Sequence, residues 1–193
     1  MFVSDSKRLA FIHSPKCGGT AIRESLKKDL HDLRRIGPGH SFPADIKGRR
    51  RSYYKVVFVR NPWTRLVSLY NYLRAQEHLS DYFRFGEEIR WLGFNAFVRS
   101  KELRANFPLQ TKWTAGVDEV FNFEHLQSDY NRMRERISLR MTTLHIANSS
   151  YTEDYWSPYT RGLVRYVSEW QRADIEAFGY EFGIEKPRGR RYE

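Results

Sequence analysis

The stretch LAFIHSPKCGGTAI (residues 9–22) decides the fold, because an apolar strand leads through a glycine-bearing loop into a helix. Backbone N–H groups at a helix start have no partners within the helix and lie at the positive end of its dipole, so they favour a phosphate or sulfate. Gly18 and Gly19 permit turns that other residues avoid, and they keep side chains away from a ligand. Lys16 adds a mobile positive charge. The sequence therefore predicts an anion-binding loop.

This loop differs from the usual nucleoside-triphosphate loop, G-x-x-x-x-G-K-[ST], in which lysine follows the glycines and a hydroxyl residue holds magnesium. Here Lys16 precedes Gly18 and Gly19, and the rest of the sequence has no evident acidic metal-binding motif. One cysteine and scattered histidines also match no zinc pattern. We therefore expect the site to bind its anion without a metal.

A second motif follows in KVVFVRNPWTRLVS (residues 55–68). Its β-branched and aromatic start predicts a buried strand, and Asn61 and Pro62 suit the cap and first turn of the next helix. Arg60 then ends a strand and Ser68 lies about two turns into the helix, near the edge where open α/β sheets bind ligands. The alternative is that Arg60 caps a loop and Ser68 is a packing residue.

The alternation of strands and helices predicts an α/β fold whose central parallel sheet is flanked by helices. A third strand is expected at 117–123, and helices are expected at 20–33, 63–76, 126–139 and 157–179. The length of 193 residues indicates one domain, which we predict at 1–183. Residues 184–193 are basic and poor in apolar side chains, so we expect a mobile tail there.

Together the two motifs resemble those of the PAPS-dependent sulfotransferases, in particular the carbohydrate branch found in the Golgi and in bacteria, sulfotransferase family 2. PAPS is 3′-phosphoadenosine 5′-phosphosulfate. SPKCGGT is similar to the family's phosphosulfate loop, P-K-x-x-[GS]-T, and RNPWTRLVS is similar to its 3′-phosphate motif, R-[DN]-P-x-x-R-x-x-S. The resemblance continues at 39–46, 117–126 and 172–182. It implies a P-loop-like three-layer fold.

The resemblance implies an enzyme that moves the sulfuryl group of PAPS to a hydroxyl by in-line transfer and releases PAP. Lys16 would stabilise the leaving phosphate. His40 would be the base, since a histidine pKa of about 6.5 leaves a neutral fraction near pH 7. The alternative is that His40 is a surface turn residue. The implied cofactor site comprises Pro15, Lys16, Cys17, Gly18, Gly19, Thr20, Ala21, Arg60, Ser68 and Ser149.

Residues 80–115 form an aromatic and polar insertion where similar enzymes build the acceptor cleft. We expect the acceptor to be a hydroxyl compound, namely a carbohydrate, which can itself be anionic. The predicted acceptor contacts are His40, Gln110 and Lys112. The side chains that could stack on sugars or meet their acidic groups are Tyr82, Phe85, Trp91, Trp113, Arg84 and Arg90. The alternative is that the aromatic residues fill a helical core.

Two other functions fit parts of the sequence. Cys17 and Arg23 have the C-x5-R spacing of cysteine-dependent phosphatases, but lysine rather than histidine precedes the cysteine, and the second motif would be unexplained. A net charge of +10, with arginines clustered at 34–35, 49–51 and 188–191, predicts an anionic partner. The second alternative is therefore a non-catalytic basic module that binds nucleic acid. Nucleic acid is not the expected primary partner, because no helix carries a continuous basic stripe and no nucleic-acid motif is present.

The sequence has neither a long apolar segment near its start nor an apolar run long enough to span a membrane. Its single cysteine excludes an internal disulfide. These features favour a cytoplasmic, bacterial protein. They do not indicate an oligomeric state.

Overall fold

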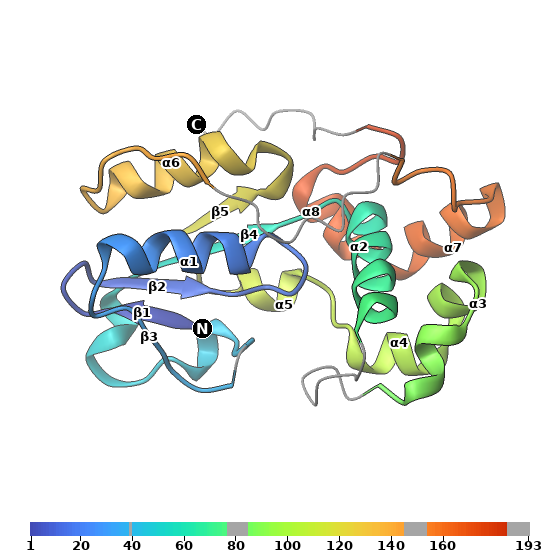
Figure 1. The fold of residues 1–193 in the computed structure, drawn as a ribbon, viewed down its shortest axis with the longest axis horizontal. Coiled ribbons are helices and arrows are strands. Elements are labelled where there is room, and N and C mark those ends of the chain that lie inside the picture. Colours follow the sequence, from blue (N-terminus) through green and yellow to red (C-terminus); the bar gives the residue numbers. More distant parts are fainter. Residues whose placement is uncertain (39, 77–84, 145–153, 185–193) are drawn as a thin grey trace. The chain divides into compact units, whose positions relative to one another are not determined.

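A computed structural model describes residues 1–38, 40–76, 85–144 and 154–184 (Figure 1). The chain divides into two compact units. The first comprises Met1–Arg60 and Gln110–Ser149, and the second comprises Asn61–Leu109 and Ser150–Glu193. A sheet forms the centre of the first unit, whereas the described part of the second unit is helical.

The sheet of the first unit has five strands in the order β3-β1-β2-β4-β5. The predicted parallel sheet is confirmed for β2 (Leu9–Ile12), β4 (Tyr54–Val59) and β5 (Glu119–Asn122). Two further strands, β1 (Phe2–Ser4) and β3 (Arg34–Arg35), add an antiparallel side that the sequence analysis did not predict. Both are too short for an alternating pattern, and β3 consists of two exposed arginines. The sheet is therefore mixed.

Both faces of this sheet are covered, and successive strand residues point to opposite faces. The helices α1 (Gly19–Asp29) and α6 (Leu126–Arg136) pack on one face, around Phe11 and Phe58 (Figure 1). The other face is covered by the chain around η1 (Pro43–Asp45) and η2 (Gly48–Ser52) and by Trp113 of α5 (Thr111–Thr114). Burial on both faces explains why β2 and the last four residues of β4 are wholly apolar.

The second unit has an aromatic core. Its elements are α2 (Pro62–Ala75), η4 (Glu87–Trp91), α3 (Phe94–Arg99), α4 (Lys101–Asn106), α7 (Arg161–Trp170) and α8 (Arg172–Phe178). Tyr70 of α2 packs against Phe94 and Phe97, and Phe94 also meets Tyr159. The predicted cap of α2 is confirmed, because the Asn61 side chain accepts a hydrogen bond from the N–H of Trp63.

The prediction of a single helix at 157–179 was wrong about where the helix starts and about its continuity. The N–H groups of Trp156 and Ser157 donate to Asp154, which forms a turn, and the helix begins only after Thr160, whose side chain caps it. The helix also breaks at Gln171 into α7 and α8. Its predicted end holds, because Gly179 adopts the left-handed conformation there, with φ 70°.

Among the described residues, no helix is both long and apolar enough to cross a membrane. The predicted domain limits at 1–183 stay a prediction. The predicted tail begins at Ile184, and the rest of it, residues 185–193, lies outside the described residues.

Candidate active site

The two sequence motifs meet at one edge of the sheet. Since β2 and β4 pair in parallel, the loop after β2 and Arg60 after β4 emerge at the same end of these strands. Nη1 of Arg60 donates to the carbonyl oxygen of Lys16 at 3.4 Å. The guanidinium also lies over the ring of Phe123, 4.1 Å from its centroid, which is a cation–π contact. The structure therefore brings Lys16 and Arg60 together.

The start of α1 suits an anion. Gly18 occupies the cap position in the left-handed conformation, with φ 76°, and as a glycine it has no side chain that could cap the helix. The first turn, which includes Thr20 and Ala21, contains no acidic residue whose negative charge would interact with the positive end of the helix dipole. The backbone N–H groups of this turn are therefore oriented for a negatively charged ligand.

Lys16 lies in an unusual environment. Its backbone is in the left-handed region, with φ 65°, which is uncommon for a residue with a side chain. Burial, and next the positive charge of Arg60, lower the pKa of its amine from 10.5 to about 8. A bound anion would offset the repulsion between these two cations. The strained loop and the crowded charges together indicate a site shaped for a ligand.

Sequence reasoning missed His13, the last residue before the SPK motif. A Cβ atom at Gly19 would lie only 1.8 Å from Cδ2 of His13, so the missing side chain at position 19 makes room for this imidazole. The ring also packs against those of Phe11 and Phe2, at centroid distances of 5.9 and 6.1 Å. Its position at the carboxyl end of a strand, directly before an anion loop, was the available signal.

His13 lies among positive charges. Burial is the largest cause that lowers the pKa of its imidazole well below 6.5, and the charges of His40, Arg23, the N-terminal amine and Lys16 act in the same direction. A proton on this ring would add to those charges. His13 is therefore neutral at pH 7.

His40 lies beside the loop and is partly buried, so it is not simply a surface turn residue. Its Nδ1 hydrogen-bonds to the carbonyl oxygen of His13, and the two rings lie 4.4 Å apart between centroids. The indole N–H of Trp113 donates to the carbonyl oxygen of His40 at 3.1 Å. Because a carbonyl can only accept, Nδ1 carries a proton, so in the neutral ring the lone pair is on Nε2.

Gln110 has a place that differs from the predicted acceptor contact. Its side chain is fully buried; Nε2 donates to the Arg60 carbonyl, and Oε1 accepts from the Arg60 N–H, both at 2.8 Å. Oε1 also accepts from Sγ of Cys17 at 3.3 Å. The Gln110 side chain thus connects Cys17 of the first motif to the backbone of Arg60 in the second.

The structure does not bring Cys17 and Arg23 into a phosphatase site. Sγ of Cys17 is buried, and oxygens of Ser14, Pro15 and Gln110 lie within hydrogen-bond distance of it, at 3.3–3.6 Å, so its one proton has three possible acceptors. Arg23 instead forms an ion pair with Glu24 at 2.6 Å.

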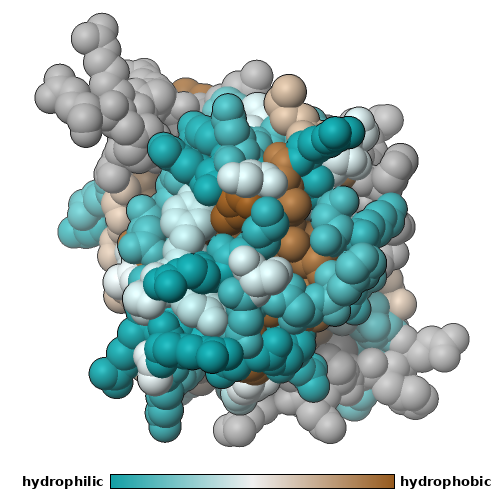
Figure 2. Space-filling view, turned by 90° about the vertical axis from the view of Figure 1, so that its left-hand side faces the viewer, coloured by the Kyte–Doolittle hydropathy of each residue, from teal (hydrophilic) through white to brown (hydrophobic). Residues whose placement is uncertain are grey.

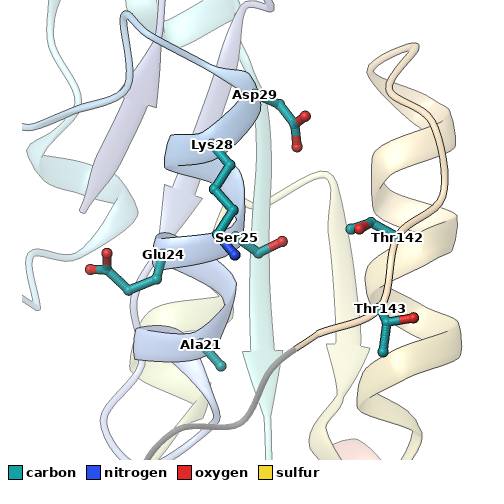
Figure 3. Close-up of a pocket in the computed structure, with 7 residues that line it drawn as sticks. All are labelled: Ala21, Glu24, Ser25, Lys28, Asp29, Thr142 and Thr143. Atoms are coloured by element: carbon teal, nitrogen blue, oxygen red, sulfur yellow. The ribbon is translucent and has the colours of Figure 1, made fainter.

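A cavity of about 280 Å³ opens between α1 and residues 142–143 (Figure 3). It is lined by Ala21, Glu24, Ser25, Lys28, Asp29, Thr142 and Thr143. The side chains of Ser25 and Thr142 point toward one another across it. Because Ala21 belongs to the first turn of α1, this cavity begins beside the predicted anion site.

The remaining predicted residues differ in their burial and in the unit to which they belong. Ser68 is 5% exposed in α2, within the second unit, and Ser149, Tyr82 and Arg84 lie outside the described residues. Phe85 and Trp113 are buried, so they cannot stack on a sugar, whereas Trp91 is 71% exposed. Arg90 pairs with Glu87, and Lys112 is exposed on α5. Among the described residues, no group of three or more His, Cys, Asp or Glu side chains could hold a metal ion.

The model of the sulfotransferase family matches residues 1–115, a region that contains the loop, Arg60 and Ser68. The chain belongs to the sulfotransferase family, and it is therefore assigned as a sulfotransferase. No curated protein and no solved structure matched the chain in the comparisons.

Proposed function

We propose that this protein transfers the sulfuryl group of PAPS to a hydroxyl of a carbohydrate. The observation that carries the proposal is the start of α1, whose cap residue is a glycine and which is flanked by Lys16 and by Arg60, the donor to the Lys16 carbonyl. Two cations and a row of backbone N–H groups match a donor that carries several negative charges. Family membership supplies the reaction class.

Sulfuryl transfer resembles phosphoryl transfer, in which catalysis rests mainly on positioning and on stabilising the charge of the leaving oxygen. We assign the stabilisation of that charge to Lys16 and to the N–H groups of Gly18, Gly19, Thr20 and Ala21. Such groups act where charge develops in the transition state. In this arrangement the leaving phosphate of PAP takes the charge, and the chain requires no metal for this step.

His40 is the proposed base. With Nδ1 bonded to the His13 carbonyl, its Nε2 lone pair can accept the proton of the acceptor hydroxyl as the new S–O bond forms. Protonated His40 would then carry a positive charge next to neutral His13.

We assign the nucleoside part of the donor to the cavity between α1 and residues 142–143 (Figure 3), because it adjoins the first turn of α1 and has hydroxyls on both sides. We assign the 3′-phosphate to Arg60. For the acceptor, exposed Trp91 offers a ring on which a sugar can stack, which supports a carbohydrate. The single cysteine supports the proposed cytoplasmic setting.

The decisive experiment is a calorimetric titration with PAP, run beside adenosine 5′-monophosphate, ATP with magnesium, and a short duplex DNA at one salt concentration. We expect PAP to bind most tightly. Arg60→Ala should weaken PAP by about tenfold or more, as expected for the loss of a charge-assisted hydrogen bond. Arg51→Ala, which removes an exposed arginine at the other end of β4, is the matched control and should leave PAP affinity unchanged.

Binding of duplex DNA or of the monophosphate without binding of PAP would overturn the proposal. Equal loss of PAP affinity in both variants would show that Arg60 acts only through net charge.

A further inference from the structure

A basic surface lies at the end of the first unit opposite the anion loop. The turn before β2 and the η2 segment before β4 lie at the amino ends of these parallel strands, whereas the loop and Arg60 follow their carboxyl ends. Figure 2 faces the left-hand side of Figure 1 and shows a largely hydrophilic surface with a small hydrophobic area. The basic end surface is defined here as Arg8, Arg34, Lys47, Arg49, Arg50 and Arg51.

Asp5 organises three of these arginines. Its carboxylate accepts hydrogen bonds from Arg34, from Nη2 of Arg49 at 3.2 Å, and from Nε of Arg50 at 3.2 Å. The Tyr53 hydroxyl also donates to Asp5 at 2.7 Å and is the largest cause that lowers the pKa of this carboxyl, followed by Arg34 and Arg50. One carboxylate balances only one of three guanidiniums. The group therefore keeps a net positive charge on side chains that Asp5 already orients.

The other cations of the surface are not balanced either. Within the described ranges, Arg8, Lys47 and Arg51 form no ion pair. Asp32 accepts from Ser4 and Ser6, and Asp45 accepts from the N–H of Phe42, but both carboxylates keep their negative charge. Together with Asp5 they offset only part of the positive charge of the surface. Positive charge is thus concentrated here and directed to solvent; the Arg49 side chain is 76% exposed.

Protection of the sheet edge explains only part of this surface. Charged residues on an edge strand discourage pairing with other chains, which accounts for Arg34 and Arg35 on β3. It does not account for Arg49 and Arg51, which belong to η2 and lie on no strand. These arginines are the part that calls for an anionic partner.

We propose that the basic end surface binds an acidic polysaccharide through its carboxylate or sulfate groups, apart from the anion loop. The paired N–H groups of a guanidinium match the oxygens of a carboxylate or sulfate. Arg34 and Arg50 already bind a carboxylate in this way, because both donate hydrogen bonds to Asp5. Single-stranded nucleic acid is less suited, because it needs exposed aromatic side chains for stacking, and Tyr53 beside the cluster is only 5% exposed. That the polymer is also the enzyme's acceptor or product rests on the proposed function; the binding itself does not.

The test uses two triple variants of the full chain with the same change in charge. Arg8→Gln/Arg49→Gln/Arg51→Gln alters the basic end surface, and Arg161→Gln/Arg165→Gln/Arg172→Gln removes exposed arginines of α7 and α8. Binding of a heparin octasaccharide is measured by calorimetry at about 50 and about 200 mM salt, with duplex DNA as the competing class of polymer. PAP is titrated into each variant as well.

We expect the surface variant to bind heparin about tenfold more weakly, with a shallower salt dependence, and the control to stay within about twofold of the parent protein. Equal weakening in both variants would overturn the proposal, because net charge alone would explain the binding. Tighter binding of duplex DNA than of heparin, lost in the surface variant, would assign the surface to nucleic acid instead. Failure of the proposed function appears separately, as absent PAP binding in the parent protein.

Discussion

At the residue scale, the two glycines of the loop are required for different physical reasons. Gly18 has a positive φ, which only glycine adopts without strain, and it turns the chain into α1. Gly19 is helical, and its missing side chain provides the space that the His13 ring occupies. The motif alone suggested one shared purpose for both residues, namely access of the backbone to an anion.

This difference makes Gly19→Ala a test of packing against His13. With His13 present, we expect the added methyl group to cost about 1–3 kcal/mol through overpacking. In the His13→Ala background the space is open, and alanine in the first helical turn should be neutral or should stabilise by up to about 1 kcal/mol. Urea unfolding of the four proteins in this cycle measures the coupling. An equal cost in both backgrounds would show that His13 is not the obstacle.

Lys16 predicts a pH dependence of ligand binding. Its pKa of about 8 means that the amine loses its charge, and therefore its attraction for PAP, as the pH rises through that value. We expect PAP affinity to fall between about pH 7.5 and 9, and Lys16→Arg to flatten the profile, because guanidinium stays protonated there. Calorimetry across this range measures both. A parent profile as flat as that of the variant would remove Lys16 from the phosphate contact.

The same pKa shift affects folding stability in the opposite direction: PAP affinity falls as the pH rises, whereas the stability of the fold increases. Because the folded pKa lies below the unfolded value of 10.5, the unfolded chain binds more protons between the two values. This residue therefore destabilises the fold below about pH 8, and its penalty is relieved as the pH rises toward 10.5.

At the scale of elements, Gln110 connects the start of α5 to the end of β4. Gln110→Ala would leave the buried N–H and carbonyl of Arg60 without these partners, so we expect a loss of about 1–3 kcal/mol in unfolding free energy. PAP affinity should fall as well, because the Arg60 backbone loses its support. Lys112→Ala, an exposed change on the same short helix, is the control and should alter stability little. Urea unfolding and PAP titration of both variants check this; similar stability for the two would contradict it.

The elements also show what sequence patterns can and cannot predict. The strand at 55–60 and the helix after Asn61 were predictable, because a buried parallel strand and a side-chain cap are local signals. β1 and β3 were not, since pairing over a few residues depends on neighbours distant in sequence. Gln110 was expected at the acceptor for the same reason: nothing near it in the sequence indicates its bonds to Arg60.

At the scale of the whole molecule, composition predicted an anionic partner but not its location. The net charge of +10 is the sum of groups with separate environments. Lys16 and Arg60 follow the carboxyl ends of β2 and β4, whereas Arg49 and Arg51 precede the amino end of β4. Only the order and direction of the strands separate the two basic regions.

The burial of Cys17 makes its thiol a probe of how often the loop opens. It is the one cysteine in the sequence, it is 1% exposed, and its sulfur lies behind the loop against Gln110. A thiol reagent can reach it only when the loop opens, so the rate of alkylation reports how often that opening occurs. Loop opening in solution can therefore be timed on the unaltered chain, without a label placed at any other position.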